Sequence, residues 1–190
     1  LVEHTIAELV NGELDRNQIK PYFANLTIGG GSIAGLVRHV DDAPRAARLI
    51  GGVVGTDSSH NHLCQGESAG TGGLSMQTDS EALLEAGVAL ARRTWASFKD
   101  TFGWDESTPD RVVTHQVGRV HRRRLYEALG LEMKKDYSTF ETLGNVGSVS
   151  LPITLALAVE HGAVETGNRV AALGDRKSTR LNSSHTHLTR

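Results

Sequence analysis

Residues 111–130 read RVVTHQVGRVHRRRLYEALG and set the pattern for the second half of the chain. A short β-branched run ends at Thr114, and apolar residues at helical spacing follow until Gly130. This pattern predicts a strand over residues 111–114 and a helix over residues 117–129 that the glycine ends. His115 therefore stands where the strand gives way to the helix.

The same alternation continues on both sides of this stretch. Residues 138–142 and 169–173 are typical of strands, and residues 148–161 are typical of a helix that ends before Gly162. Upstream, Thr78 and Glu81 form a capping-box pattern. Apolar residues at spacings of four and three then follow until Gly103 and mark one face of a long helix: Leu84, Val88, Ala91, Trp95, Phe98 and Phe102. Alternating strands and helices with short connections predict an α/β layered sheet.

The N-terminal part is less regular. A short helix is expected within residues 1–14, ended at Gly12, and residues 21–28 read as an extended approach to a run of three glycines. Residues 48–54 are strand-like. Residues 60–76 are rich in Gly, Ser, Asn and His and are expected to be irregular.

Composition narrows the class of protein. The chain has 190 residues, of which 22% are charged and 38% hydrophobic, as in ordinary globular proteins. Its 20 basic and 22 acidic residues give a net charge of -2, which argues against a nucleic-acid-binding surface. A single cysteine excludes internal disulfides and suits the reducing cytoplasm. The sequence shows no membrane-spanning run and no signal peptide, and without an initiator Met it is expected to begin inside a longer protein.

The last residues differ from the rest. Residues 175–190 read DRKSTRLNSSHTHLTR, with four basic residues and no apolar period. They interrupt a strand-like run that ends at Gly174. We therefore predict a non-native tail that makes few contacts, with a native disordered tail as the alternative.

Two strand ends carry polar side chains suited to catalysis. His115 follows residues 111–114, and Asn145 lies between Gly144 and Gly147 after the next predicted strand. Adjacent parallel strands would bring the imidazole and the carboxamide together. The glycines would let a substrate or another loop approach closely. Taken singly, a histidine satisfied at a strand end and an ordinary turn are the simpler interpretations.

These residues, with the sequence GNVGSVSLP over residues 144–152, resemble the C-terminal half of the ketoacyl-acyl-carrier-protein synthase III group of the thiolase superfamily. The resemblance extends to residues 129–131 and 162–170 and to the Gly-rich stretch over residues 27–37. Within that group, Val146 and Gly147, residues 63–66 and the Trp95 helix are most similar to olefin-pathway enzymes that condense two fatty acyl thioesters.

The resemblance implies a fragment of an α/β thiolase-like layered fold. Residues 1–77 would be the end of the first half-repeat with a connecting segment, residues 78–174 most of the second half-repeat, and residues 175–190 the tail. It also implies a Cys-His-Asn site for Claisen condensation, in which His115 and Asn145 hold a thioester oxygen. Gly144, Gly147 and Arg119 are the candidate substrate-binding residues, and neither a metal nor a cofactor is implied.

The nucleophilic cysteine of the family is expected upstream of this chain. Cys64 is the only candidate by composition, but it lacks the small-residue turn of an acylated cysteine and is more simply a packed thiol. We therefore expect the chain by itself to be inactive.

Other motifs favour ordinary interpretations. The glycines at 29 and 31 fit a dinucleotide fingerprint without its acidic partner, which favours a buried glycine-rich strand. His60, His62 and Cys64 could face one metal but lack a fourth ligand. Four arginines and a histidine give the helix after His115 a basic face, which is either a solvated surface or an attraction for an acidic carrier protein or coenzyme A phosphates: Arg119, His121, Arg122, Arg123 and Arg124.

The predicted function is acyl transfer by Claisen-type condensation of acyl thioesters, in fatty acid or long-chain olefin and ketone biosynthesis. Alternatives are a hydroxymethylglutaryl-CoA synthase-like or type III polyketide synthase-like enzyme, or a non-catalytic α/β partner subunit. The expected partners are acyl-CoA or acyl-carrier-protein substrates and, in the full-length form, a second copy in a cytoplasmic homodimer.

Overall fold

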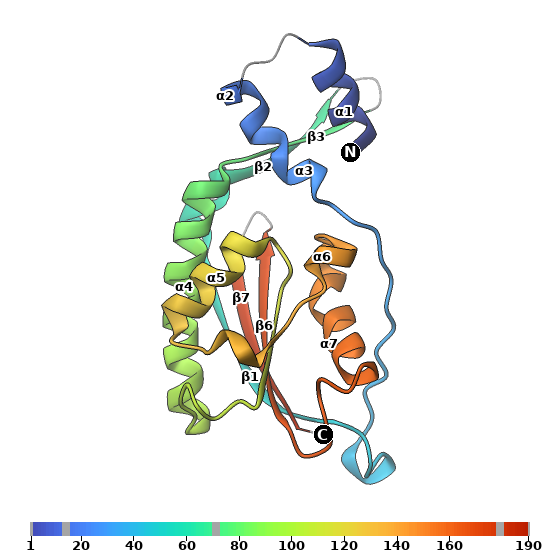
Figure 1. The fold of residues 1–190 in the computed structure, drawn as a ribbon. Helices are drawn as coiled ribbons and strands as arrows, with labels where there is room; N and C mark the ends of the chain where they lie inside the picture. The colour runs from blue at the N-terminus through green and yellow to red at the C-terminus, as the bar shows by residue number, and fades with distance from the viewer. Residues whose placement is uncertain (1, 13–15, 70–72, 178–180, 190) are drawn as a thin grey trace.

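The computed structural model describes residues 2–12, 16–69, 73–177 and 181–189 (Figure 1). The helices are α1 (Val2–Asn11), α2 (Arg16–Ile19), α3 (Phe23–Leu26), α4 (Ser80–Phe102), α5 (Arg119–Leu129), α6 (Phe140–Leu143) and α7 (Ser150–Glu160). The strands are β1 (Arg48–Asp57), β2 (Cys64–Ala69), β3 (Gly73–Thr78), β4 (Arg111–Thr114), β5 (Asp136–Tyr137), β6 (Arg169–Lys177) and β7 (Leu181–Thr189).

A five-stranded mixed sheet forms the body, in the order β1-β7-β6-β4-β5. Strand β4 runs parallel to β5 and β6, while β7 is antiparallel to both of its neighbours. The β2–β3 hairpin is a separate two-stranded sheet, and it lies with α1, α2 and α3 at one end of the molecule (Figure 1). No described helix combines the length and the apolar character needed to cross a bilayer.

Alternation along β4 divides the core between the two faces of the sheet. Val112 packs with the cluster from α4 and α5, whereas Val113 packs with Ala158 and Val164 on the α7 side. Both valines are completely buried. Successive strand residues point to opposite faces, so each valine contributes to one of the two layers that flank the sheet.

Aromatic side chains fill the α4 side of the core. Trp95 and Phe98 stack with ring centroids 5.4 Å apart, and Trp104 meets Phe98 edge-on at 5.3 Å. The spacing of three between Trp95 and Phe98 keeps both on one helix face, as the sequence pattern predicts.

The long helix begins one residue later than the capping-box prediction implies. Asp79 caps α4 by accepting a hydrogen bond from the amide of Ala82 at 3.0 Å. Thr78 is instead the last, buried residue of β3, and its hydroxyl lies 3.5 Å from Cys64 Sγ. The cap assigned to Thr78 was therefore wrong, because pairing of β3 with β2 extends through that residue.

Four predictions of local structure were wrong. The glycines at 29 and 31 lie in a largely exposed segment without regular secondary structure, rather than in a buried strand. Residues 23–26 form the short helix α3 rather than an extended approach, and most of residues 60–76 form the β2–β3 hairpin rather than an irregular segment. Residues 140–143 form α6, so the expected strand over residues 138–142 is absent, and β5 ends earlier at Tyr137. Short elements such as these depend on tertiary contacts that local propensity does not encode.

The prediction that the tail makes few contacts was also wrong. Strand β7 pairs with β1 on one side and with β6 on the other, so the edge of β6 is covered. An extended backbone can complete hydrogen bonding between two strands without an apolar period in its side chains. The non-native origin of these residues stays a prediction from composition.

Candidate active site

His115 stands at the carboxyl end of β4. Its amide donates to the carbonyl of Leu173 at 2.9 Å, which continues the parallel β4–β6 ladder by one residue. The half-buried imidazole lines a small recess of about 20 Å³ between α4, α5 and residues 173–175 of β6. The sheet therefore fixes the backbone that carries the imidazole.

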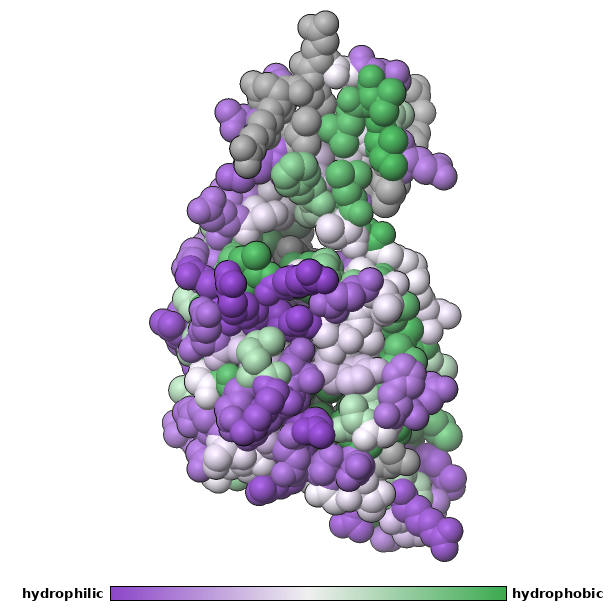
Figure 2. Space-filling model, in the orientation of Figure 1, coloured by the Kyte–Doolittle hydropathy of each residue, from purple (hydrophilic) through white to green (hydrophobic). Residues whose placement is uncertain are grey.

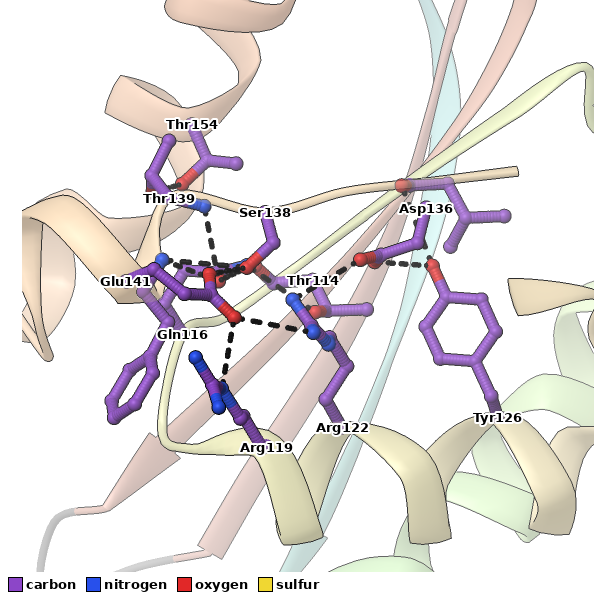
Figure 3. A network of polar contacts seen from close by, with 12 residues as sticks. Thr114, Gln116, Arg119, Arg122, Tyr126, Asp136, Ser138, Thr139, Glu141 and Thr154 are labelled. Carbon is purple, nitrogen blue, oxygen red and sulfur yellow. Dashed lines mark hydrogen bonds and ion pairs between the residues drawn. The ribbon is translucent and has the colours of Figure 1, made fainter. Parts of the chain in front are cut away.

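Gln116 joins this strand end to the segment that leads to Asn145 (Figure 3). Its side chain is buried, and Nε2 donates to the carbonyl of Thr114 at 2.7 Å. Its Oε1 lies 3.0 Å from Ser138 Oγ and accepts from the amides of Thr139 at 3.4 Å and Phe140 at 3.2 Å. One carboxamide thus contacts both the strand end that carries His115 and the segment that leads to Asn145.

Asn145 follows directly after α6 and Gly144. Its amide donates to the carbonyl of Thr27 at 2.9 Å, and its carbonyl accepts from the amide of Gly29 at 2.9 Å. In the side chain, Oδ1 accepts from the amide of Gly147 at 3.0 Å. Because the oxygen is turned back to the main chain, Nδ2 is the part of the carboxamide that remains to donate to a ligand.

Gly144 allows two chain segments to touch. It has a φ of 66° and a ψ of -155°, and a Cβ there would lie 2.7 Å from the carbonyl oxygen of Thr27. The sequence left open whether a substrate or another loop approaches these glycines. At Gly144 the structure shows another loop, the segment at Thr27. A Cβ at Gly147 would meet no atom within 4 Å, so that side of the turn is open.

A large cavity opens beside Asn145. Its volume is about 820 Å³, and it is bounded by α3, the start of α4, the start of α5 and Phe140. Apolar side chains supply much of the wall: Phe23, Ala24, Ile28, Leu83, Leu84, Val117, Val120 and Phe140. A cavity of this size and composition suits an organic ligand with a substantial apolar part.

The recess at His115 adjoins this cavity, because His121 and Asp175 line both. These two side chains are in contact, with Nε2 and Oδ2 3.4 Å apart. His115 and Asn145 therefore border neighbouring hollows. From the sequence, adjacent parallel strands were expected to bring the imidazole and the carboxamide together. That reason was wrong, since Asn145 follows α6 and not an adjacent strand. The close approach of the two side chains stays a prediction.

A charged network connects α5 with β5 and α6 (Figure 3). Arg122 pairs with Asp136 at 3.4 Å and with Glu141 at 3.4 Å, and the Tyr126 hydroxyl donates to Asp136 at 2.7 Å. Burial raises the pKa of Asp136. The hydrogen bond from the Ser138 hydroxyl is the main cause of a lowered pKa at Glu141. The network fastens α5 to the segment that precedes Asn145.

Basic side chains gather on the exposed face of α5, where Figure 2 shows a hydrophilic region below apolar residues of the α1–α3 end. Arg119 and Arg123 are well exposed, and both line the large cavity with Arg124. Each has an acidic partner: Glu141 for Arg119, Glu127 for Arg123 and Glu85 for Arg124. This face is therefore a set of ion pairs at the cavity rim.

Cys64 lines neither hollow, and it packs against the cluster of Leu83 and Leu90. The thiol contacts Thr78, and His60 Nδ1 lies 3.0 Å from Ser59 Oγ. The described parts of the chain contain no group of three His, Cys, Asp or Glu residues that could hold a metal ion. The sequence alternative of a His60-His62-Cys64 metal site is therefore not supported.

The sequence shows Gln116 next to His115, but no role for Gln116 was predicted from it. The hydrogen bond between Tyr126 and Asp136 was not predicted either. A buried amide or phenol with partners in distant segments leaves no periodic pattern. The one indication was the placement of a carboxamide directly after a strand-end histidine.

The family model described as "3-Oxoacyl-[acyl-carrier-protein (ACP)] synthase III C terminal" matches residues 100–175. These residues include His115 and Asn145. Residues 100–175 are therefore similar to the C-terminal part of ketoacyl synthase III enzymes. The chain is 31% identical to the acyl-CoA:acyl-CoA alkyltransferase of Xanthomonas campestris pv. campestris, over 90% of this chain and 49% of that protein. It is 35% identical to the enzyme of the same name from Shewanella oneidensis, over 80% of this chain and 45% of the relative.

A crystal structure gives the same relationship in three dimensions. OleA from Xanthomonas campestris, solved with bound lauric acid and lauroyl-CoA, superposes with a TM-score of 0.86 at 28% identity, over 100% of this chain and 55% of that one. The fold is therefore thiolase-like, as the sequence resemblance implies. The chain spans about half the length of the two alkyltransferases it matches.

Proposed function

We propose that this ketoacyl synthase III segment supplies the oxyanion-binding half of an active site for Claisen-type condensation of acyl thioesters. The observation that carries the proposal is the orientation of Asn145, whose Oδ1 is held by the Gly147 amide beside a cavity of about 820 Å³. Nδ2 is left to donate into that space. A neutral imidazole at His115 would add a second donor without a competing charge.

The chemistry follows from these two donors. The α-carbon of one acyl thioester loses a proton to a base of the full-length enzyme, and the carbonyl oxygen of the resulting enolate gains negative charge. N–H groups of His115 and Asn145 stabilise that charge. The α-carbon then bonds to the acyl carbon of the second substrate, which is carried as a thioester on a cysteine. The carbon–sulfur bond breaks, and the cysteine leaves as a thiolate.

We infer that the substrates are carried by coenzyme A or an acyl carrier protein. The apolar wall of the large cavity suits an acyl chain, and the basic residues at its rim suit phosphates or an acidic carrier surface. Arg119 is the rim residue assigned from sequence, and it lines this cavity. A homodimer and a cytoplasmic location remain predictions.

The test uses a chimera in which this chain replaces the matching part of the Xanthomonas campestris alkyltransferase. His115→Ala and Asn145→Asp should each lower kcat for condensation of lauroyl-CoA by about 100- to 1000-fold, as expected for the loss of one oxyanion donor. His62→Ala, on an exposed side chain outside both cavities, is the matched control and should keep full activity. An active chimera that is indifferent to both site substitutions would point to a binding or partner role.

A further inference from the structure

We infer that Gln116 is a positioning residue that sets where Asn145 stands relative to His115, a role that rests on the proposed function. Its side chain is 2% exposed, so it does not meet solvent. Its two polar ends are bonded to different elements, with Nε2 on the β4 side and Oε1 on the α6 side.

On the β4 side, Gln116 supplies a hydrogen-bond donor to a carbonyl that strand β5 does not reach. Strand β5 pairs with Val112 and Val113 through Asp136 and Tyr137, and then the chain leaves the sheet. The carbonyl of Thr114 lies one residue beyond that pairing, and Gln116 Nε2 donates to it at 2.7 Å. A buried carbonyl requires such a partner, so the side chain completes the strand end that carries His115.

On the α6 side, Gln116 caps a helix whose N-cap residue does not. The Phe140 amide also donates to Ser138 Oγ, at 3.4 Å. Helix α6 has only four residues, and its N-cap Thr139 makes no side-chain cap. The Thr139 hydroxyl is engaged instead with Thr154 at 2.6 Å. Gln116 Oε1 accepts from the amides of Thr139 and Phe140 in its place. A single helical turn has little stability of its own, so this external cap determines where the turn sits.

Backbone hydrogen bonds within the α6 turn connect this cap to the residue before Asn145. The amides of Leu143 and Gly144 donate to the carbonyls of Thr139 and Phe140 at 2.9 and 3.0 Å. Asn145 follows at once. A shift of the α6 turn therefore moves the carboxamide relative to the imidazole, and misplacement by about 1 Å can cost on the order of 100-fold in rate.

The test compares Gln116→Ala with Val112→Ala in the chimera. Val112 is completely buried on the same strand, so its truncation destabilises β4 without touching the polar contacts. Well below both melting temperatures, Gln116→Ala should lower kcat ~10- to 100-fold and leave KM within about twofold. Val112→Ala should leave both constants near those of the parent. Equal losses in the two variants, or no loss in Gln116→Ala, would overturn the inference.

A second measurement does not depend on turnover. In the 190-residue chain, NMR signals of the Asn145 side-chain amide should shift in Gln116→Ala and stay in place in Val112→Ala. Unchanged Asn145 signals would refute the positioning role. If His115→Ala leaves condensation intact, the proposed function fails, and the Asn145 signals alone then decide the role of Gln116.

Discussion

At the scale of single residues, the site depends on where a few polar groups are held. His115 is fixed through the β4–β6 ladder, and Asn145 is fixed through the carbonyl of Thr27 and the amide of Gly29. Both residues were proposed as site residues from their places in the sequence, and that assignment stays a prediction. Their supports could not be predicted, because residues 27–29 lie more than a hundred positions away and form no regular strand there beyond an isolated bridge from Ile28 to Asn145.

Gly144→Ala tests this support. The φ of 66° with a ψ of -155° is a conformation that only glycine adopts easily, and the added Cβ would lie 2.7 Å from the Thr27 carbonyl oxygen. We expect the free energy of unfolding to fall by about 3 kcal/mol, measured by urea denaturation. Gly103→Ala has the same φ with a ψ of 33° and no neighbour within 4 Å of the Cβ, so its expected loss is about 1 kcal/mol. Equal losses would contradict the clash.

At the scale of elements, long periodic segments were predictable and short ones were not. Helices α4, α5 and α7 and strands β1 and β4 follow from apolar spacing and terminal glycines, because burial of one face determines them. Helix α6 was predicted as a strand. Its turn depends on a cap from Gln116 in another segment, and no local sequence pattern carries that information.

The Tyr126–Asp136 contact between α5 and β5 yields a pH-dependent prediction. Tyr126→Phe removes the hydroxyl that donates to Asp136, a carboxylate with 7% of its side chain exposed. The free energy of unfolding at neutral pH should fall by about 1–3 kcal/mol. Tyr137→Phe is the matched control, because its hydroxyl contacts the exposed His161.

The sign of the pH effect follows from the pKa of Asp136. Burial raises this pKa above its unfolded value, so the carboxyl contributes stability in acid that is lost as pH rises through the folded pKa. The Tyr126 hydrogen bond lowers the pKa, and its removal should raise it further. The deficit of Tyr126→Phe should therefore shrink in acid and grow toward neutral pH, as measured by denaturation across a pH series. A deficit that is independent of pH would exclude Asp136 as its cause.

At the scale of the whole molecule, the sheet accommodates segments of very different composition. Strand β6 follows from its apolar run, and β7 pairs along it although residues 181–189 have no apolar period. Composition could therefore predict which segments build the core but not which backbone would lie between β1 and β6. Backbone hydrogen bonding is common to all sequences, and it does not show in a hydropathy pattern.

The arrangement of the molecule also predicts which steps the chain can perform alone. Cys64 is the only cysteine of the 190 residues, and it lines neither the recess of His115 nor the large cavity beside Asn145. Its thiol lies 3.5 Å from the Thr78 hydroxyl. Acyl transfer requires a thiolate near the bound thioester. The chain should therefore bind lauroyl-CoA without forming an acyl-enzyme.

Intact-mass spectrometry after incubation with lauroyl-CoA measures this directly. We expect no stoichiometric gain of a lauroyl group by the 190-residue chain, whereas the chimera with the Xanthomonas campestris alkyltransferase should gain one. Cys64→Ser is the matched control, and its mass should respond as the parent's does. A lauroyl adduct on the parent chain that disappears in Cys64→Ser would make Cys64 the nucleophile. That result would place the reacting thiol on the β2–β3 hairpin, and the two hollows at His115 and Asn145 would then need another role.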